Sequence, residues 1–159
     1  MAAPPTILYK RATFVTQLPV HHRYAPSHCW IAPDPASPTS NRWRVGYTKF
    51  ALRMLGEVVD SQFDHPAGTP IQPGDILGSI EGFKAVSDLY SVGHGTFAGG
   101  NPALLNDPES IARAPYTDGW IYAFDGHPDP QTLDVHQYQH LLDSTIDRIL
   151  AQQKTDDPA

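Results

Sequence analysis

Gly78-Ser79-Ile80-Glu81-Gly82-Phe83-Lys84-Ala85-Val86-Ser87-Asp88-Leu89-Tyr90-Ser91 is the stretch of this 159-residue chain from which the fold can be read. It predicts two short strands joined by a tight turn, because apolar residues lie on both sides of a centre where Gly82 permits the necessary backbone angles. Lys84 then lies beside the turn and faces water. Most surface lysines are only solvated, so the residues around Lys84 decide whether it has a function.

These surroundings resemble the lipoyl-lysine hairpin of glycine cleavage system H proteins, whose pattern is Glu-Ser-Val-Lys-Ala-x-Ser-Asp-x-x-Ser. The residues that match this pattern are Glu81, Lys84, Ala85, Ser87, Asp88 and Ser91. The methionines that flank the lysine of biotin carriers are absent. The resemblance implies that Lys84 bears covalent lipoate and that lipoate ligase or lipoyl transferase recognises Glu81 and Asp88. The cofactor would then supply the chemistry, and the protein would supply display and docking.

Two more segments resemble this family, in the correct order along the chain. Residues 24–31 are similar to its Tyr-x-x-Ser-His-Glu-Trp-Val segment, and residues 115–121 to its Pro-Tyr-x-x-Gly-Trp-Leu segment. Each motif alone is weak, but three in order are specific. The resemblance implies a mainly β fold, a barrel-sandwich hybrid of the lipoyl/biotinyl-carrier type, with small flanking helices and a C-terminal helix. The expected divisions are an N-terminal extension with a strand (1–23), an H-protein-like lipoyl-carrier domain (24–150) and a frayed tail (151–159).

Residue patterns give an independent estimate of the elements. Residues 42–47 and the segment that begins at Val58 have strand patterns, and residues 13–16 also look like a strand. Residues 48–55 predict a helix that Thr48 caps and Gly56 ends. Without the resemblance, these patterns would indicate only a small all-β domain with a terminal helix.

The second half of the chain is predicted in the same way. The glycines of residues 92–101 favour a weak or bulged strand, and Asp107 followed by Pro108 predicts a short helical turn with Asp107 as its cap. A last strand is expected through Trp120, Tyr122 and Phe124. The clearest helix covers residues 134–152, where Asp134 and Gln137 form a capping pair and one face is apolar.

Composition limits the function. The 11 basic and 17 acidic residues give a net charge of 11 − 17 = −6, which disfavours binding to nucleic acid. No apolar run approaches the roughly 20 residues of a membrane span, and Met1 to Pro5 show no secretory signal. Cys29 is the single cysteine, so no internal disulfide can form. A monomeric protein of the cytoplasm is the simplest expectation.

Other kinds of site have little support. No nucleophile–base pair, phosphate loop or paired-carboxylate motif is visible, so the chain is predicted to be a carrier and not an enzyme. His21, His22, His28 and Cys29 are metal-ligating residue types, but they lack a standard ligand spacing, and no metal is predicted. The three tryptophans are expected to pack rather than to form a binding box.

Cys29 is the most informative departure from the family, which has glutamate at this position. In H proteins this acidic residue is associated with the amine on the loaded lipoyl arm, since a carboxylate can hold an ammonium group. Ser27 and Asp88 match other positions near the docked arm. A thiol is no substitute unless it ionises, and its ordinary pKa is about 8.5. Either Cys29 is a small buried residue, or it marks a carrier with a different cargo.

Three functions follow in order of preference. The first is a lipoyl carrier whose swinging arm on Lys84 shuttles a sulfur-bound intermediate, similar to the lipoate-binding proteins of bacterial sulfur oxidation, with a heterodisulfide-reductase-like complex as partner. The second is a glycine cleavage system H protein that carries the aminomethyl group between glycine cleavage enzymes. The third is an interaction module that is not lipoylated.

Overall fold

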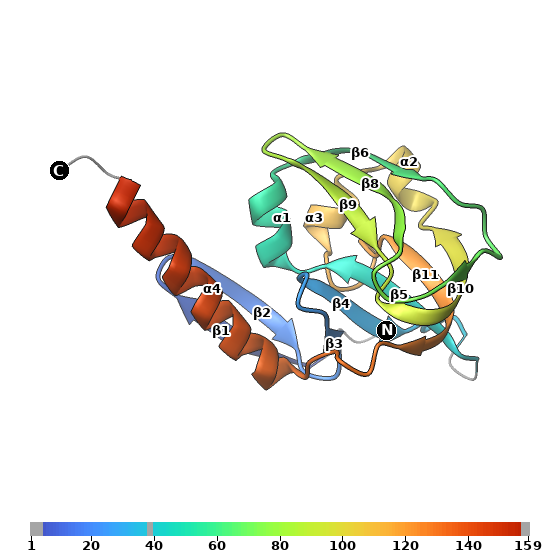
Figure 1. The fold of residues 1–159 in the computed structure, drawn as a ribbon, viewed down its shortest axis with the longest axis horizontal. Helices are drawn as coiled ribbons and strands as arrows, with labels where there is room; N and C mark the ends of the chain where they lie inside the picture. Colours follow the sequence, from blue (N-terminus) through green and yellow to red (C-terminus); the bar gives the residue numbers. More distant parts are fainter. Residues whose placement is uncertain (1–4, 38–39, 157–159) are drawn as a thin grey trace.

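The structure is a computed structural model that describes residues 5–37 and 40–156. The strands are β1 (Thr6–Arg11), β2 (Phe14–Pro19), β3 (Arg23–Tyr24), β4 (Cys29–Pro33), β5 (Arg42–Tyr47), β6 (Val58–Phe63), β7 (Pro70–Ile71), β8 (Ile76–Gly82), β9 (Val86–Tyr90), β10 (Gly93–Gly100) and β11 (Tyr122–Pro128). The helices are α1 (Lys49–Leu55), α2 (Ala103–Asn106), α3 (Ser110–Arg113) and α4 (Val135–Asp156). The chain is therefore mainly β with small helices and a C-terminal helix, as predicted (Figure 1).

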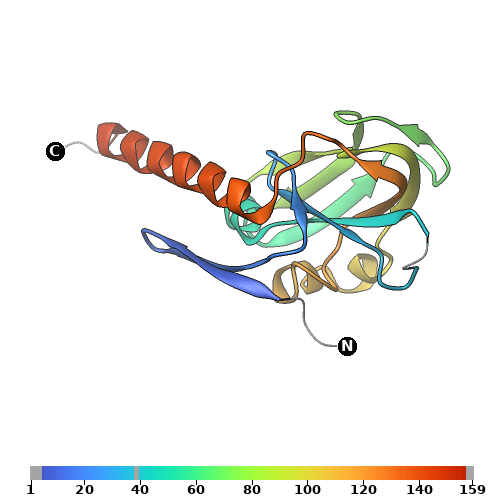
Figure 2. The same ribbon diagram turned by 90° about the horizontal axis from the view of Figure 1, so that it is seen from below.

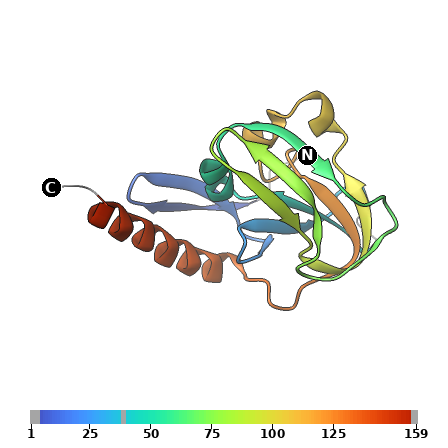
Figure 3. The same ribbon diagram turned by 45° about the horizontal axis from the view of Figure 1, so that its top comes forward.

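Two antiparallel sheets face each other across the main core. The larger has the strand order β3-β4-β5-β11-β10-β7, and the smaller has the order β6-β8-β9 (Figure 3). The larger sheet contributes Ile31 and Phe124 to the core, and the smaller contributes Leu77 and Ile80, all of them fully buried. Burial of these apolar side chains is the main force that holds the sheets together.

Helix α1 connects the two sheets, and its ends follow from the sequence as predicted. The backbone N–H of Ala51 donates to Thr48 Oγ1 at 3.4 Å, which caps the first turn. Gly56 ends the helix with a φ of 80°, a conformation that glycine adopts without strain. Because β5 precedes α1 and β6 follows it, the helix lies at one end of the sandwich, beside the β8–β9 hairpin (Figure 1).

Three predictions for residues 92–128 have different outcomes. The bulge in β10 is confirmed, since its register shifts between Phe97 and Gly99. The prediction that Asp107 caps a helix through its side chain is wrong, because its backbone oxygen receives the Ser110 N–H and its carboxylate pairs with Arg113. The last strand begins at Tyr122, not at Trp120, whose N–H is held in a turn by the carbonyl of Thr117.

An appendage, defined here as residues 6–19 and 135–156, lies outside the sandwich. The predicted strand at residues 13–16 lies largely within β2, and β1, which pairs with β2, was not predicted. The β1–β2 hairpin and α4 extend from the sandwich in the same direction (Figures 1 and 2). A second apolar core, which includes Phe14, Phe50 and Leu142, joins them to β4 and α1.

The start of α4 confirms the predicted capping pair. The N–H of Asp134 donates to Gln137 Oε1 at 2.9 Å, and the N–H of Gln137 donates to Asp134 Oδ1 at 2.8 Å. The helix continues to Asp156, beyond the predicted end at residue 152, and the last part of the expected frayed tail lies outside the described residues. Within the described residues, no helix combines the length and the apolar character that a membrane span requires.

Candidate functional site

The tip of the β8–β9 hairpin is formed by Phe83, Lys84 and Ala85, which are all exposed. The N–H of Gly82 donates to the carbonyl of Ala85 at 2.9 Å and closes the turn. Phe83 is 74% exposed, which is unusual for so large an apolar side chain. The hairpin therefore presents a lysine between two uncovered apolar residues, as the sequence predicts.

The C-terminal end of α1 and the segment that directly follows it anchor this tip. The N–H of Lys84 donates to the carbonyl of Leu55, and the N–H of Phe83 donates to the carbonyl of Glu57, both at 3.0 Å. A Cβ atom added at Gly82 would lie only 2.2 Å from the carbonyl oxygen of Leu55, so this close approach requires glycine. The last carbonyls of a helix have no partner within the helix, and the hairpin tip supplies one here.

The side chain of Lys84 runs over the end of α1. Its Nζ donates to the carbonyl oxygen of Arg53 at 3.1 Å, and a Cβ atom added at Gly56 would lie 2.9 Å from Lys84 Cγ. Lys84 has no carboxylate partner among the described residues. An exposed amine without an ion-pair partner suits covalent acylation, because loss of its charge would break no salt bridge.

The predicted recognition residues lie on the strands that flank the tip. Glu81 is on β8 and Asp88 is on β9, and both are exposed. Ser87 belongs to the opposite face of β9 and is half-buried, where its Oγ receives the Tyr47 hydroxyl at 3.5 Å. The two carboxylates are thus available to a modifying enzyme or a partner that approaches the hairpin.

A groove of about 190 Å³ begins at Ala85 and is called the Ser27 groove here. Its lining consists of Ser27, His28, Tyr47, Phe50, Ala51, Met54, Leu55, Ala85 and Ser87. The structure thus brings Ser27, one of the predicted arm residues, to a surface beside the hairpin. No carboxylate is among the residues that line the groove.

Cys29 lies behind the wall of the Ser27 groove and is not part of its lining. It is buried on β4 opposite Tyr47, and Ser27 Oγ donates to its sulfur at 3.9 Å. Burial raises the pKa of the Cys29 thiol to about 12, so the thiol is neutral near pH 7. Cys29 is therefore a small buried residue, which was one of the two interpretations of this position that the sequence allowed.

A second groove, called the Lys84 groove here, has a volume of about 300 Å³ and lies on the other side of Met54. The β1–β2 turn, α1, Lys84 and α4 line it. Its residues are Arg11, Ala12, Thr13, Phe14, Phe50, Arg53, Met54, Lys84, Ile146, Ile149, Leu150 and Gln153. The sequence does not predict this groove, because no local pattern shows that residues more than a hundred positions apart would meet.

Two of the histidines considered as metal ligands make contacts within the fold instead. His28 Nδ1 is 2.8 Å from the Tyr138 hydroxyl, and His22 Nε2 is 3.1 Å from the carbonyl of Tyr116. No group of three or more potential metal ligands occurs within residues 5–37 and 40–156.

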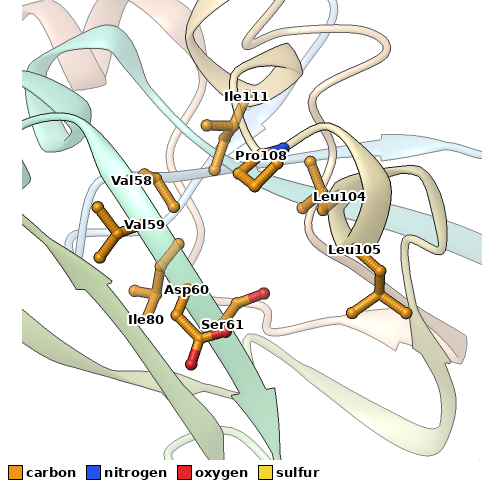
Figure 4. A pocket seen from close by; sticks show the side chains of 9 residues that line it. All are labelled: Val58, Val59, Asp60, Ser61, Ile80, Leu104, Leu105, Pro108 and Ile111. Carbon is orange, nitrogen blue, oxygen red and sulfur yellow. The ribbon is translucent and has the colours of Figure 1, made fainter.

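A small hollow of about 90 Å³ lies between β6 and the α2–α3 segment, with Leu105 at its rim, and contains none of the predicted site residues (Figure 4).

A β sandwich that displays an exposed lysine on an anchored hairpin tip, with grooves beside it, is the arrangement expected of a carrier protein. Residues 22–145 match the family model described as glycine cleavage H-protein. The chain belongs to this family, whose members are carriers and not catalysts and bear covalent lipoate on a lysine.

Individual relatives agree with this assignment. A probable glycine cleavage system H protein of Halobacterium salinarum is 40% identical over 74% of this chain and 90% of its own length. The glycine cleavage system H protein of Kocuria rhizophila is 33% identical over 81% of this chain and its entire length. The crystal structure of the Mycobacterium marinum H protein has a TM-score of 0.66 and 32% identity, and covers 76% of this chain and 95% of its own. The predicted carrier-type fold is thereby confirmed.

Proposed function

We propose that Lys84 is the lipoyl attachment residue and that this protein is the mobile carrier of a multienzyme system. The observation that supports the attachment site most directly is the exposed Lys84 side chain on a tip that two backbone hydrogen bonds anchor, one to the last residue of α1 and one to Glu57 just beyond the helix. Lipoate would supply a dithiolane that cycles between disulfide and dithiol. The hairpin orients the arm, and tethering raises the effective concentration of the cargo at each partner.

The preferred cargo is the aminomethyl group derived from glycine. The relatives carry the name glycine cleavage system H protein, and this supports the second function of the sequence analysis better than the first. Glycine cleavage enzymes and a lipoate ligase or lipoyl transferase would then be the partners. The predicted cytoplasmic location and monomeric state belong to the same proposal.

A sulfur-bound cargo is the second candidate, because one observation favours it. Cys29 is neutral and buried at the position where the family has glutamate, and no carboxylate lines the Ser27 groove. A cargo with an ammonium group would therefore lack its usual partner there. In this case a heterodisulfide-reductase-like complex of sulfur oxidation would be the partner.

Intact-mass measurement tests the attachment site. Protein treated with a lipoate ligase and lipoate should gain one lipoyl mass, which peptide mapping should place on Lys84. Lys84→Arg should gain none, although it keeps the positive charge. Modification of another residue, or no modification of the wild type, would refute the carrier assignment for Lys84.

Glycine–bicarbonate exchange with the glycine cleavage enzymes tests the cargo. We expect activity from fully lipoylated wild type if the aminomethyl group is the cargo. Inactivity of the wild type, together with partial activity of Cys29→Glu at equal lipoylation, would favour the sulfur-bound cargo instead. Thermal unfolding of both proteins must accompany this assay, since a buried carboxylate destabilises a core.

A further inference from the structure

We infer that the unloaded lipoyl arm of Lys84 rests in the Lys84 groove, against the appendage, and not in the Ser27 groove. The inference rests on the proposed attachment of lipoate to Lys84. It assigns a function to the β1–β2 hairpin and the end of α4, which the carrier mechanism itself does not use. Four observations support it.

The first is the direction of the lysine side chain. Lys84 is in the lining of the Lys84 groove, whereas its neighbour Ala85 lines the Ser27 groove. The Nζ atom of Lys84 donates to the carbonyl of Arg53, which lines the Lys84 groove as well. Acylation leaves one N–H on this nitrogen, so the same hydrogen bond can persist. The root of the arm would then point toward the groove against the appendage.

The second is the chemistry of the groove. Phe14, Phe50 and Ile149 contribute apolar surface to its lining, and Met54 and Leu150 remain 54% and 38% exposed. Its volume of about 300 Å³ is at the lower end of the range of roughly 300–1,000 Å³ typical of small-molecule sites. An alkyl chain that ends in a cyclic disulfide is apolar, so covering these side chains would be favourable.

The third is charge. Arg11 forms ion pairs with Asp147 at 2.7 Å and Asp143 at 3.3 Å, which hold the β1–β2 turn against α4. Within the described part of the chain, Arg53 has no carboxylate partner, and its guanidinium lies 5.8 Å from the centre of the Phe14 ring. Once Lys84 is acylated and uncharged, the unpaired positive charge in the lining therefore comes from Arg53. It disfavours an ammonium group in the groove and tolerates the uncharged disulfide, so the groove suits the arm without an amine cargo.

The fourth is the origin of the lining in the sequence. The β1–β2 turn and the α4 residues from Ile146 onward lie outside residues 22–145, which match the family model. The matched segment alone would leave this side of α1 open. The β1–β2 turn and the end of α4 thus supply a wall of the groove that the matched segment does not contain.

Methyl NMR spectra of the unmodified and the fully lipoylated protein test this inference directly. Lipoylation should shift the methyl signals of Ile149 and Leu150, which line the Lys84 groove and not the Ser27 groove, and give contacts between Leu150 and the protons of the arm. The Cβ and backbone signals of Ser27 and Ser87 should change little. Shifts confined to the Ser27 groove, or shifts at the tip alone, would overturn the inference.

A matched pair of variants adds a chemical measurement. Leu150→Gln should expose the dithiolane and increase its rate of reduction by a water-soluble phosphine roughly threefold. Leu105→Gln should leave the rate unchanged, because the Leu105 side chain is 78% exposed on α2 and lines neither groove. Equal rates in all three proteins would contradict the inference.

Intact mass separates the two proposals. A protein without a lipoyl mass on Lys84 would overturn the proposed function and the resting site together. A fully lipoylated protein without shifts at Ile149 and Leu150 would overturn only the resting site.

Discussion

The backbone N–H of Lys84 donates to the carbonyl of Leu55, the last residue of α1, at 3.0 Å. The helix end and the lysine-bearing turn are therefore one structural unit, although 29 positions separate the two residues in the chain (84 − 55 = 29). Two backbone contacts and a buried Gly82 make the tip a rigid platform. A modifying enzyme that reads the shape of the turn would depend on this contact.

Gly82→Ala tests the platform. The added Cβ would lie 2.2 Å from the carbonyl oxygen of Leu55, so the tip must move away from α1. We expect a loss of unfolding free energy of about 1–3 kcal/mol, the usual cost of overpacking, together with slower lipoylation of Lys84. Thermal unfolding and intact mass over time would measure the two effects.

Val86→Ala is the matched control, because Val86 is 68% exposed and also lies beside the tip. It should change stability by less than about 0.5 kcal/mol and leave the rate of lipoylation unchanged. If Gly82→Ala behaved in the same way as Val86→Ala, the close contact with Leu55 would have no role in presenting the lysine.

Glu81→Ala and Asp88→Ala test recognition. Both side chains are exposed on the strands that flank Lys84, so each variant should keep its unfolding free energy within about 0.5 kcal/mol of the wild type. Each should nevertheless slow lipoylation or weaken partner docking, because an exposed carboxylate is lost near the acceptor lysine. Modification kinetics with a lipoate ligase would measure this. A large loss of stability would show that these carboxylates are structural.

The sequence predicts those parts of the structure whose determining residues are close together in the chain. Helix α1 could be predicted because Thr48 and Gly56 lie at its two ends, and the β8–β9 hairpin because apolar residues lie on both sides of its tip. The expected role of Gly82 is wrong, since it has no positive φ and is required instead by its close approach to Leu55. The Lys84 groove could not be predicted, because Phe14 and Leu150 come together only in the fold. Local patterns report local structure, whereas a groove depends on distant packing.

The same limit applies to Cys29. The resemblance to the family indicates that position 29 is special, but it cannot say whether the side chain faces a groove or the core. Cys29 pairs with Tyr47 of β5, and its sulfur accepts a hydrogen bond from Ser27 Oγ. Both neighbours line the groove, so the thiol lies behind the groove wall. The tertiary structure therefore shows that the thiol is buried, which no local pattern around position 29 could indicate, and the exchange assay with Cys29→Glu tests the cargo.

The raised pKa of Cys29 predicts how stability depends on alkaline pH. Burial raises the pKa of the Cys29 thiol to about 12 from an ordinary value of about 8.5 to 9.0, so the native state retains a proton that the unfolded state loses. Its contribution to stability is present below about pH 9 and is lost as the pH rises toward 12. Urea unfolding between pH 8 and about pH 10 should therefore show a steeper loss in the wild type than in Cys29→Ala. Parallel curves for the two proteins would contradict the assigned burial.

The final prediction concerns His28 and Tyr138, which connect the sandwich to α4. The Tyr138 hydroxyl lies 2.8 Å from His28 Nδ1 and 2.8 Å from Thr48 Oγ1, and the Tyr138 ring stacks on Tyr24. Burial lowers the pKa of His28 from 6.5 to about 4, because the partly buried site disfavours the imidazolium. The contact therefore belongs to the neutral imidazole.

Acid should weaken this connection. Between about pH 6.5 and pH 4 the unfolded chain binds a proton at His28 that the native state does not, so stability is present above this window and falls as the pH drops through it. The loss from His28 can reach about 3 kcal/mol at 1.36 kcal/mol for each pKa unit. His28→Gln can still hydrogen-bond to the Tyr138 hydroxyl but does not titrate, so its urea midpoint should fall less between these pH values. If the two proteins lost stability equally, groups other than His28 would be responsible for the acid sensitivity.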